Sequence, residues 1–596
     1  MVILSMHVFA LPVVHTAVPR PPPMGWNSWN YYACNINASV MDELGEFLVS
    51  SKLADLGFTY VNSDDCWMSA TRTANGEWVP DPIRFPDGIA PLASKLHARG
   101  LHLGLYTARA ATTCQKRAGS CNHTTVDANW LAARGVDYLK EDDCGKCGVK
   151  LTDYAAMQRA LDATNRSIVL TIEGTPDVRV ASVNGIGTAR RVGHDIGPSW
   201  LSMISLVDIG AGLYPYAHNG SSTASPPRRA FYNDLDILEI GNGDFSAVAD
   251  DDDADDSRLA MARAHYTMWC AMKAVLLLGN DLPRSSAATL AIIGNPTLAA
   301  MNQDPWGVQA QRVSRTPARN QTITEDVNAA AVFEPCDERE PLQSWRYDAT
   351  SGALSTVDTR GDGAAWCLVD VDVSPGSLRA VRCNNATATN PDQKWVWTTA
   401  EESLLQLTDA AHPKNKLGFV QRLGSTGPTD RSVWTCMASA LCNNTHTVRL
   451  TFNGSDGTSS TSSGFPIRIV SGGTGPSDKE KGRKGSNMCL RLESGAVLEV
   501  WAGLLSGWRY AVVLLNRSPA ADDISIDVST LSTWRDGTHG SGRTWAVRDV
   551  WANASVPGVH SGVFTRAVPA HGVVLLILSA PPPQAHQVAA PLLRPI

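Results

Sequence analysis

The chain has 596 residues, of which 43% are hydrophobic and 18% charged, and its formal net charge is −7 at pH 7. This composition excludes a disordered chain, because it supplies enough apolar side chains for a large core. The negative charge argues against a general nucleic-acid binder, and after the N-terminus no apolar run reaches the ~18 residues of a membrane-spanning helix.

The N-terminal segment MVILSMHVFALPVVHTA is short, apolar and ends in small residues. It is typical of a secretory signal peptide, although no basic residue precedes the apolar run; a mis-started gene model is the alternative. N-x-S/T triplets recur along the chain from Asn37 to Asn553, as in secreted glycoproteins. We therefore expect residues 1–17 to be a signal peptide and the protein to be secreted, lysosomal or vacuolar.

The 13 cysteines do not follow the spacing of a zinc site. The stretch Cys144-Gly-Lys-Cys147 has the spacing of a redox motif, but an oxidising compartment favours structural disulfides. Because the count is odd, at least one thiol stays unpaired. We expect it to be Cys270, which lies in an apolar, helix-like run.

Residues 24–305 alternate short apolar runs with amphipathic stretches. Helix-like stretches at 40–56, 90–99, 127–134 and 154–164 separate runs such as 58–62, 101–106, 136–139, 167–172 and 273–278. Short buried strands separated by helices indicate a parallel sheet. About eight such units predict a (β/α)₈ TIM barrel, an α/β fold, over residues 20–312.

The C-terminal half has a different texture, rich in Gly, Ser, Thr and Asn. Residues 320–495 read as a β-rich insertion with exposed linkers, in which Gln343-Ser-Trp345 and Gln393-Lys-Trp395 resemble repeats of a ricin-type β-trefoil lectin. An unrelated β-rich insertion is the alternative. Alternating strands return over residues 496–580 and predict an antiparallel β-sandwich.

Acidic residues follow several of the expected barrel strands, at the end where barrels carry their active sites. Converging carboxylates without histidine ligands suggest either a divalent-metal site or glycoside hydrolysis, which needs one ionised and one protonated carboxyl group. The acids concerned are Asp64 and Asp65, Glu141 to Asp143, Glu173, Asp195, and Asp234 and Asp236.

Several motifs resemble the signatures of glycoside hydrolase family 27, the retaining α-galactosidases and α-N-acetylgalactosaminidases. They occur in family order and cover about residues 20–312, and the likeness resumes at Val500-Trp-Ala-Gly-Leu-Leu-Ser506. The motifs are Met24-Gly-Trp-Asn-Ser-Trp-Asn30, Asp64-Asp-Cys-Trp67, Tyr138-Leu-Lys-Glu-Asp-Asp-Cys144, Asn233-Asp-Leu-Asp236 and Asn302-Gln-Asp-Pro-Trp-Gly307.

The resemblance implies a retaining exo-glycosidase that hydrolyses terminal α-D-galactosyl residues. Asp142 would be the nucleophile that forms a covalent glycosyl-enzyme, and Asp195 the general acid/base. The sugar-binding residues would be Trp29, Asp64, Asp65, Tyr106, Lys140, Glu173, Arg191 and Asp236. The family's disulfides would be Cys34–Cys66 and Cys114–Cys144; we add Cys121–Cys147 because these residues neighbour the second pair.

Departures from the family pattern leave the sugar open. The segment Tyr106-Thr-Ala-Arg-Ala110 lacks an acid, and Glu141 replaces a residue that is commonly aromatic, which we expect to add negative charge near Asp142. A β-L-arabinopyranosidase, an α-N-acetylgalactosaminidase and a non-catalytic carbohydrate-binding protein are the alternatives. We expect no cofactor and no metal. The expected partners are a galactose-containing oligosaccharide, polysaccharide or glycolipid, without nucleic acid or a membrane span, and a second copy of the chain in a homodimer.

Overall fold

The structure is a computed structural model. It describes residues 21–317 apart from 146, 174–185, 194, 215–229 and 247–255, the backbone of strands within 329–493, and residues 497–579 apart from 530 and 532–543. The N-terminal segment expected to be a signal peptide lies outside the described residues.

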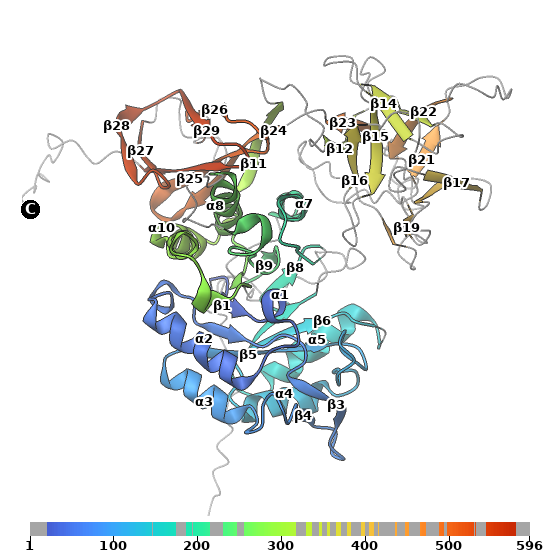
Figure 1. Ribbon diagram of the computed structural model, residues 1–596, viewed down its shortest axis with the longest axis vertical. Coiled ribbons are helices and arrows are strands. Elements are labelled where there is room, and N and C mark those ends of the chain that lie inside the picture. The colour runs from blue at the N-terminus through green and yellow to red at the C-terminus, as the bar shows by residue number, and fades with distance from the viewer. Residues whose placement is uncertain are drawn as a thin grey trace, which may run out of the picture.

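Eight parallel strands form the barrel, as the alternating pattern predicted (Figure 1). Their order is β10-β1-β2-β5-β6-β7-β8-β9, and a parallel bridge between Leu238 and Leu278 joins the two ends of this sheet. Each strand is followed by its crossover in the chain, so all eight carboxyl ends meet at one mouth. The strands are β1 Met24–Asn27, β2 Tyr60–Asn62, β5 His102–Ala108, β6 Tyr138–Asp142, β7 Val169–Ile172, β8 Ala189–Arg191, β9 Tyr232–Asp234 and β10 Leu276–Leu278.

Helices cover the outside of the barrel and bury their apolar faces against it. In α2, Met41, Leu44 and Leu48 follow helical spacing and are fully buried. None of the described helices is both long and apolar enough to span a membrane. The helices are α1 Trp29–Tyr32, α2 Ala38–Ser50, α3 Ala90–Ala98, α4 Thr124–Ala133, α5 Lys150–Asp162, α7 Trp200–Ala211, α8 Asp256–Ala271, α9 Ala287–Ile293 and α10 Pro296–Asn302.

The C-terminal sandwich consists of a six-stranded antiparallel sheet and a two-stranded sheet, β26 and β29. Side chains alternate between the two faces of its central strands, and each face packs against a different core. In β25, Val512 and Leu514 belong to the core between the two sheets, whereas Val513 and Leu515 join the barrel core. The strands are β11 Gln311–Pro317, β24 Val497–Leu505, β25 Arg509–Asn516, β26 Asp522–Asp527, β27 Trp545–Asp549, β28 Ala554–His560, β29 Val563–Val568 and β30 Val573–Ser579.

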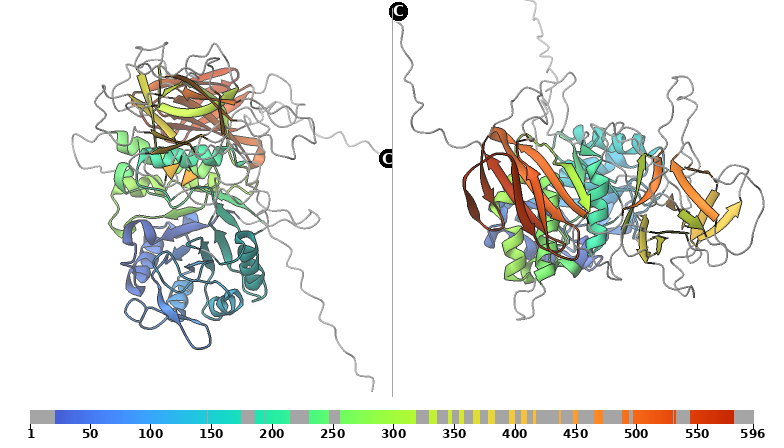
Figure 2. Two further views of the ribbon diagram at one scale, coloured as in Figure 1. Left: turned by 90° about the vertical axis from the view of Figure 1, so that its right-hand side faces the viewer. Right: turned by 90° about the horizontal axis from the view of Figure 1, so that it is seen from above.

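The β-rich insertion enters and leaves through two neighbouring strands of this sandwich. Strand β11 pairs with β24, and the last pair in this register is Pro317 with Val497. The sequence had suggested that the sandwich starts after the insertion, but its first strand, β11, precedes the insertion. Within 329–493 the described strands are antiparallel, and they form a group of their own in Figure 1 and in the right-hand view of Figure 2. The β-trefoil interpretation of this insertion stays a prediction.

A buried ion cluster ties the insertion point to the barrel. Arg517 Nη1 lies 3.0 Å from Asp208 Oδ2 on α7, and its Nη2 lies 2.8 Å from Glu499 Oε1 on β24. Arg312 of β11 contacts the same two acids. Burial alone would raise the pKa of Asp208, but Arg517 and Arg312 outweigh it and lower this pKa. Removing one partner would leave a buried charge uncompensated, so the cluster fixes β11 and β24 in place.

The three expected disulfides are present: Cys34–Cys66, Cys114–Cys144 and Cys121–Cys147. Among the described cysteines, Cys270 is the free one, and it is buried. One glycosylation triplet is misleading, because Asn516 is fully buried and donates its amide hydrogens to the carbonyls of Ala520 and Val568. A glycan cannot be attached there in the folded protein.

We predict that the insertion is dispensable for folding of the barrel. Replacing residues 318–496 by Asn-Gly, a two-residue hairpin turn, should join β11 to β24 without disturbing their register or the ion cluster. The shortened protein should be soluble and should hydrolyse a small aryl glycoside within about twofold of the full-length rate, since the two regions are separate. Insoluble or inactive protein, compared with the same chain carrying Asp142→Asn, would contradict this.

Candidate active site

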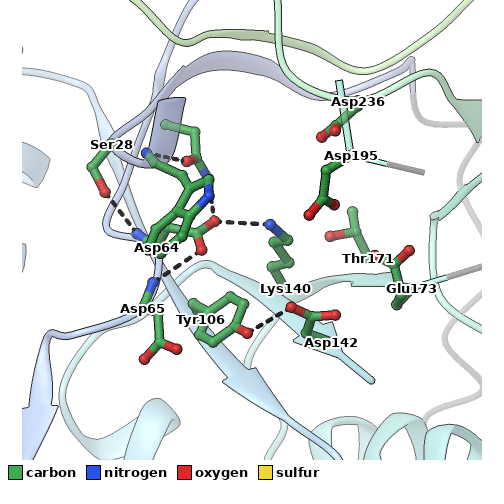
Figure 3. A network of polar contacts seen from close by, with 12 residues as sticks. Ser28, Asp64, Asp65, Tyr106, Lys140, Asp142, Thr171, Glu173, Asp195 and Asp236 are labelled. Atoms are coloured by element: carbon green, nitrogen blue, oxygen red, sulfur yellow. Dashed lines mark hydrogen bonds and ion pairs between the residues drawn. The ribbon is translucent and has the colours of Figure 1, made fainter. Parts of the chain in front are cut away.

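The residues expected to form the site come together at the carboxyl ends of the barrel strands (Figure 3). Asp64 follows β2, Tyr106 lies on β5, and Lys140 and Asp142 lie on β6. Because side chains alternate along a strand, Lys140 and Asp142 both face the mouth. Trp29, Glu173, Asp195 and Asp236 follow β1, β7, β8 and β9, and Arg191 is the last residue of β8.

A chain of hydrogen bonds connects Trp29 to Lys140 through Asp64. The Asn27 side chain accepts from the Trp29 backbone N–H at 2.9 Å and donates to Asp64 Oδ2 at 3.0 Å. Lys140 Nζ donates to the same carboxylate oxygen at 2.9 Å. Burial by itself lowers the pKa of Lys140, but the charges of Asp64 and Asp142 outweigh it and raise this pKa. Lys140 is therefore a permanent cation beside Asp142.

Both carboxylate oxygens of Asp142 accept a hydrogen bond. The Tyr106 hydroxyl donates to Oδ2 at 2.6 Å, and the Asp143 backbone N–H donates to Oδ1 at 2.6 Å. Burial, followed by the charge of Asp142, raises the pKa of Tyr106, so this tyrosine keeps its proton. Hydrogen bonds to both oxygens fix the orientation of the Asp142 carboxylate.

Arg191 is shared by three carboxyl groups on different elements. Its Nη2 lies 2.8 Å from Asp195 Oδ1 and 2.9 Å from Asp236 Oδ2, and its Nη1 lies 3.4 Å from Glu173 Oε2. The Asp195 side chain is 86% exposed, whereas that of Asp236 is 6% exposed. In Figure 3, Asp195 and Asp142 direct their carboxyl groups toward the space beside the Lys140 ammonium.

Burial raises the pKa of Glu173 and Asp236 against the opposing effect of Arg191. The same two acids, after the opposing effect of burial, raise the pKa of Arg191. Glu173 and Asp236 therefore hold a proton more readily than exposed acids do, whereas Arg191 stays charged. The site thus contains two different acids: Asp142, which is oriented by hydrogen bonds, and Asp195, which is exposed and paired with Arg191.

Asp65 is placed differently from the other predicted residues. Its carboxylate accepts from the Cys66 backbone N–H at 2.7 Å, and from the Thr113 hydroxyl and the Gln115 backbone N–H at 2.9 Å each. Burial raises the pKa of Asp65. These bonds hold the loop that carries Cys114, so in this structure Asp65 supports one wall of the site. Its contact with a sugar stays a prediction.

Some residues of the site had no role assigned from the sequence: Asn27 and Ser28 were not singled out, and Asp234 was named only as an acid at a strand end. Asn27 and Ser28 hold Asp64, whose backbone N–H donates to the Ser28 hydroxyl at 2.9 Å. Asp234 lines the pocket beneath the mouth together with Lys140, Thr171 and Arg191, and burial raises the pKa of Asp234 to about 6. The signal was available, because Asn27, Ser28 and Asp234 lie inside two of the quoted motifs.

The family models agree with this geometry. A model described as alpha galactosidase A matches residues 21–304, and one described as the alpha galactosidase C-terminal beta sandwich domain matches residues 495–578. Alpha-galactosidase 3 from Arabidopsis thaliana is 40% identical over 351 residues, which are 57% of this chain and 75% of that protein. The chain belongs to glycoside hydrolase family 27. The α-galactosidase from Cyamopsis tetragonoloba is 37% identical over 301 residues, 50% of this chain and 68% of that protein.

Solved structures of the family share the fold. Alpha-galactosidase I from Mortierella vinacea has a TM-score of 0.57 at 21% identity and covers 95% of this chain and 99% of its own. A family 27 β-L-arabinopyranosidase from Geobacillus stearothermophilus reaches 0.53 at 14% identity, covering 94% and 96%. Since enzymes for two sugars have this fold, the fold alone does not select the sugar.

The sequence had suggested that Glu141 adds negative charge beside Asp142 in the family 27 site. The structure places Glu141 elsewhere. It alternates to the outer face of β6, where it is fully buried and its carboxyl oxygens have no hydrogen-bond partner among the described residues. Burial, followed by the charges of Asp153 and Asp127, raises the pKa of Glu141 well above its usual value, and Arg109 opposes this. Glu141 therefore holds its proton more strongly than an exposed glutamate does, and it lies behind β6 rather than at the mouth.

Arg109 connects this outer layer to β6. Its side chain donates to Asp143 at 2.8 Å and to Asp153 of α5 at 2.6 Å, and its backbone N–H donates to the Asp142 carbonyl at 2.9 Å. It is 4% exposed. The segment after Tyr106 lacks the acid of the family pattern and contains Arg109 instead, which binds Asp143, the residue after Asp142.

We predict that Glu141→Gln changes how stability depends on pH. A group whose pKa is raised on folding stabilises the protein below its unfolded pKa, and this stability is lost as the pH rises. The variant lacks that loss, so its melting temperature should match the wild type near pH 4 and exceed it by roughly a few °C at pH 8. Glu43→Gln, at an exposed position of α2, is the control and should show no such trend. Parallel pH curves for wild type and Glu141→Gln would contradict the prediction.

Proposed function

We propose that the protein is a retaining exo-α-galactosidase with Asp142 as nucleophile and Asp195 as general acid/base. The observation that carries the proposal is the pairing of two differently supported carboxyl groups at one barrel mouth. Asp142 is held by Tyr106 and the Asp143 N–H, and Asp195 is exposed on Arg191. Membership of family 27 and the 40% identical α-galactosidase support the reaction and the sugar.

The first step is displacement at the anomeric carbon. A carboxylate oxygen of Asp142 attacks this carbon while the bond to the leaving oxygen breaks, and Asp195 gives its proton to that oxygen. A covalent glycosyl-enzyme results. Asp195, now ionised, takes a proton from water, which attacks the same carbon and releases Asp142. Two displacements return the sugar with its original anomeric configuration.

The remaining polar groups bind and orient the sugar. Lys140 and Asp64 form one donor–acceptor pair, and Arg191 with Glu173 and Asp236 forms another, so hydroxyls can both donate and accept at the mouth. Trp29, held by Asn27 at its backbone, supplies an apolar ring for the sugar face. Preorganised donors of this kind spend no energy on reorientation during the reaction.

The proposed substrates are galactose-containing oligosaccharides, polysaccharides or glycolipids, and the proposed location is secreted, lysosomal or vacuolar. A family member from Saccharomyces cerevisiae was solved with raffinose and shares the fold at a TM-score of 0.57, 17% identity and 94% coverage of this chain. β-L-Arabinopyranosides are the second substrate to test, because an enzyme for them has the same fold. A homodimer remains a proposal.

Asp142→Asn should abolish turnover, because an amide cannot form the glycosyl-enzyme. We expect kcat to fall by at least about 1,000-fold, or about 4 kcal/mol in activation free energy. The melting temperature should stay near the wild-type value, since Asn can still accept from Tyr106. An unchanged rate would refute the nucleophile assignment.

Asp195→Ala should affect substrates according to their leaving groups. Proton donation contributes about 10²–10⁴-fold to a poor leaving group and much less to an activated aryl group. Melibiose hydrolysis should therefore fall far more than that of a nitrophenyl galactoside, and added azide should rescue only the latter. Equal losses on both would contradict the acid/base role.

The deciding experiment is a panel of aryl glycosides, comprising the α-galactoside, the β-L-arabinopyranoside and the α-N-acetylgalactosaminide. NMR should identify the first product anomer. We expect the α-galactoside to react fastest and the anomeric configuration to be retained, with Asp142→Asn as the background control. An inverted product would overturn the mechanism. Sugar binding without any hydrolysis would favour a carbohydrate-binding protein.

A further inference from the structure

A cluster of two histidines and one aspartate lies at the end of the barrel opposite to the active site. His97 is in the last turn of α3, His102 is the first residue of β5, and Asp137 directly precedes β6. Since these residues lie at the amino ends of their strands, they have no part in the chemistry at the carboxyl ends. Neither the family nor the proposed reaction assigns them a task.

The three donor atoms have the spacing of a metal site. His97 Nε2 lies 2.7 Å and His102 Nδ1 3.9 Å from Asp137 Oδ2, and all three atoms are within 4.8 Å of one another. In a tetrahedral zinc site with bonds of about 2.0–2.1 Å, neighbouring ligand atoms are about 3.4 Å apart. Small side-chain rotations therefore suffice to place all three at bonding distance from one ion.

We propose that His97, His102 and Asp137 bind a zinc ion, with water as the fourth ligand. Imidazole nitrogens combined with one carboxylate suit zinc, whereas calcium and magnesium prefer oxygen ligands alone. The site is open to solvent, since His97 and His102 side chains are 34% and 45% exposed. The ion can enter from outside and keep a water ligand. This site departs from the expectation that the protein binds no metal.

Outer contacts hold the ligands in place. Asp137 Oδ2 accepts from the Leu103 backbone N–H at 3.0 Å, and Asp137 Oδ1 pairs with Arg166 at 2.5 Å. The His102 ring packs against Tyr60 with ring centroids 5.1 Å apart. Such contacts fix ligand orientation in metal sites. The guanidinium of Arg166 binds Oδ1, so that Oδ2 is the oxygen nearest to the two histidines.

A zinc ion here would connect three elements at the base of the barrel. It would join α3 to the starts of β5 and β6, the strands that carry Tyr106 and Asp142 at their other ends. An ion that binds the folded state alone raises stability by mass action. The role we assign to it is therefore structural, and hydrolysis should not require it.

The test is isothermal titration of ZnCl₂ into chelator-treated, tag-free full-length protein. We expect one zinc per chain and a higher melting temperature, and no heat with CaCl₂ or MgCl₂. His102→Gln and Asp137→Asn should each remove the binding and the zinc-dependent gain in melting temperature. His560→Gln, on the sandwich, is the matched control and should keep both.

Absence of a one-to-one isotherm in the wild type, or an isotherm that persists in His102→Gln, would overturn the site. If Asp137→Asn weakens folding by loss of the Arg166 pair, His102→Gln decides alone, because this side chain is nearly half exposed. Aryl α-galactoside hydrolysis should stay within about twofold with and without zinc. Hydrolysis that depends on zinc would refute the structural role, whereas zinc binding and the gain in melting temperature are measured independently of the glycosidase assignment.

Discussion

Two buried cations govern the active site. Lys140, on β6, contacts Asp64, which follows β2. Arg191, on β8, contacts Glu173, Asp195 and Asp236, which follow β7, β8 and β9. Such a set of buried charges is costly unless every member is compensated. The positions of the strand ends are therefore coupled, because a shift of one strand would separate a cation from an acid on its neighbour.

This coupling explains why the site is built in advance of the substrate. Asp142 has a donor on each oxygen, Asp64 is shared by Asn27 and Lys140, and Asp236 accepts from the Ile196 backbone N–H as well as from Arg191. The exposed member is Asp195, to which we assign the proton transfers to the leaving group and from water. Asp64, Asp142 and Asp236 are thus held rigidly, whereas Asp195 is accessible to solvent.

The sequence predicted the barrel, the sandwich and the three disulfides, because strand and helix periods and family motifs are local signals. It did not predict which face a strand residue occupies once neighbours are packed. Glu141 was expected beside Asp142, yet alternation along β6 turns it into the layer behind the barrel. The sugar contact expected of Asp65 stays a prediction; what the sequence did not show is that its carboxylate also accepts hydrogen bonds from Thr113 and Gln115. Strand β11 escaped notice because its partner is far away in the chain.

The placement of the insertion has a consequence for the order of folding. Strands β11 and β24 pair across about 180 intervening residues, and closing so long a loop is entropically unfavourable. Strands β12 Ala329–Pro335 and β23 Met488–Glu493, the first and last of the insertion, also pair with each other. Once they have done so, only about 14 residues separate the ends of β11 and β24, which lowers the closure cost by about 2 kcal/mol. We therefore expect β12 to pair with β23 first during synthesis, which brings β24 close to β11 in the sandwich.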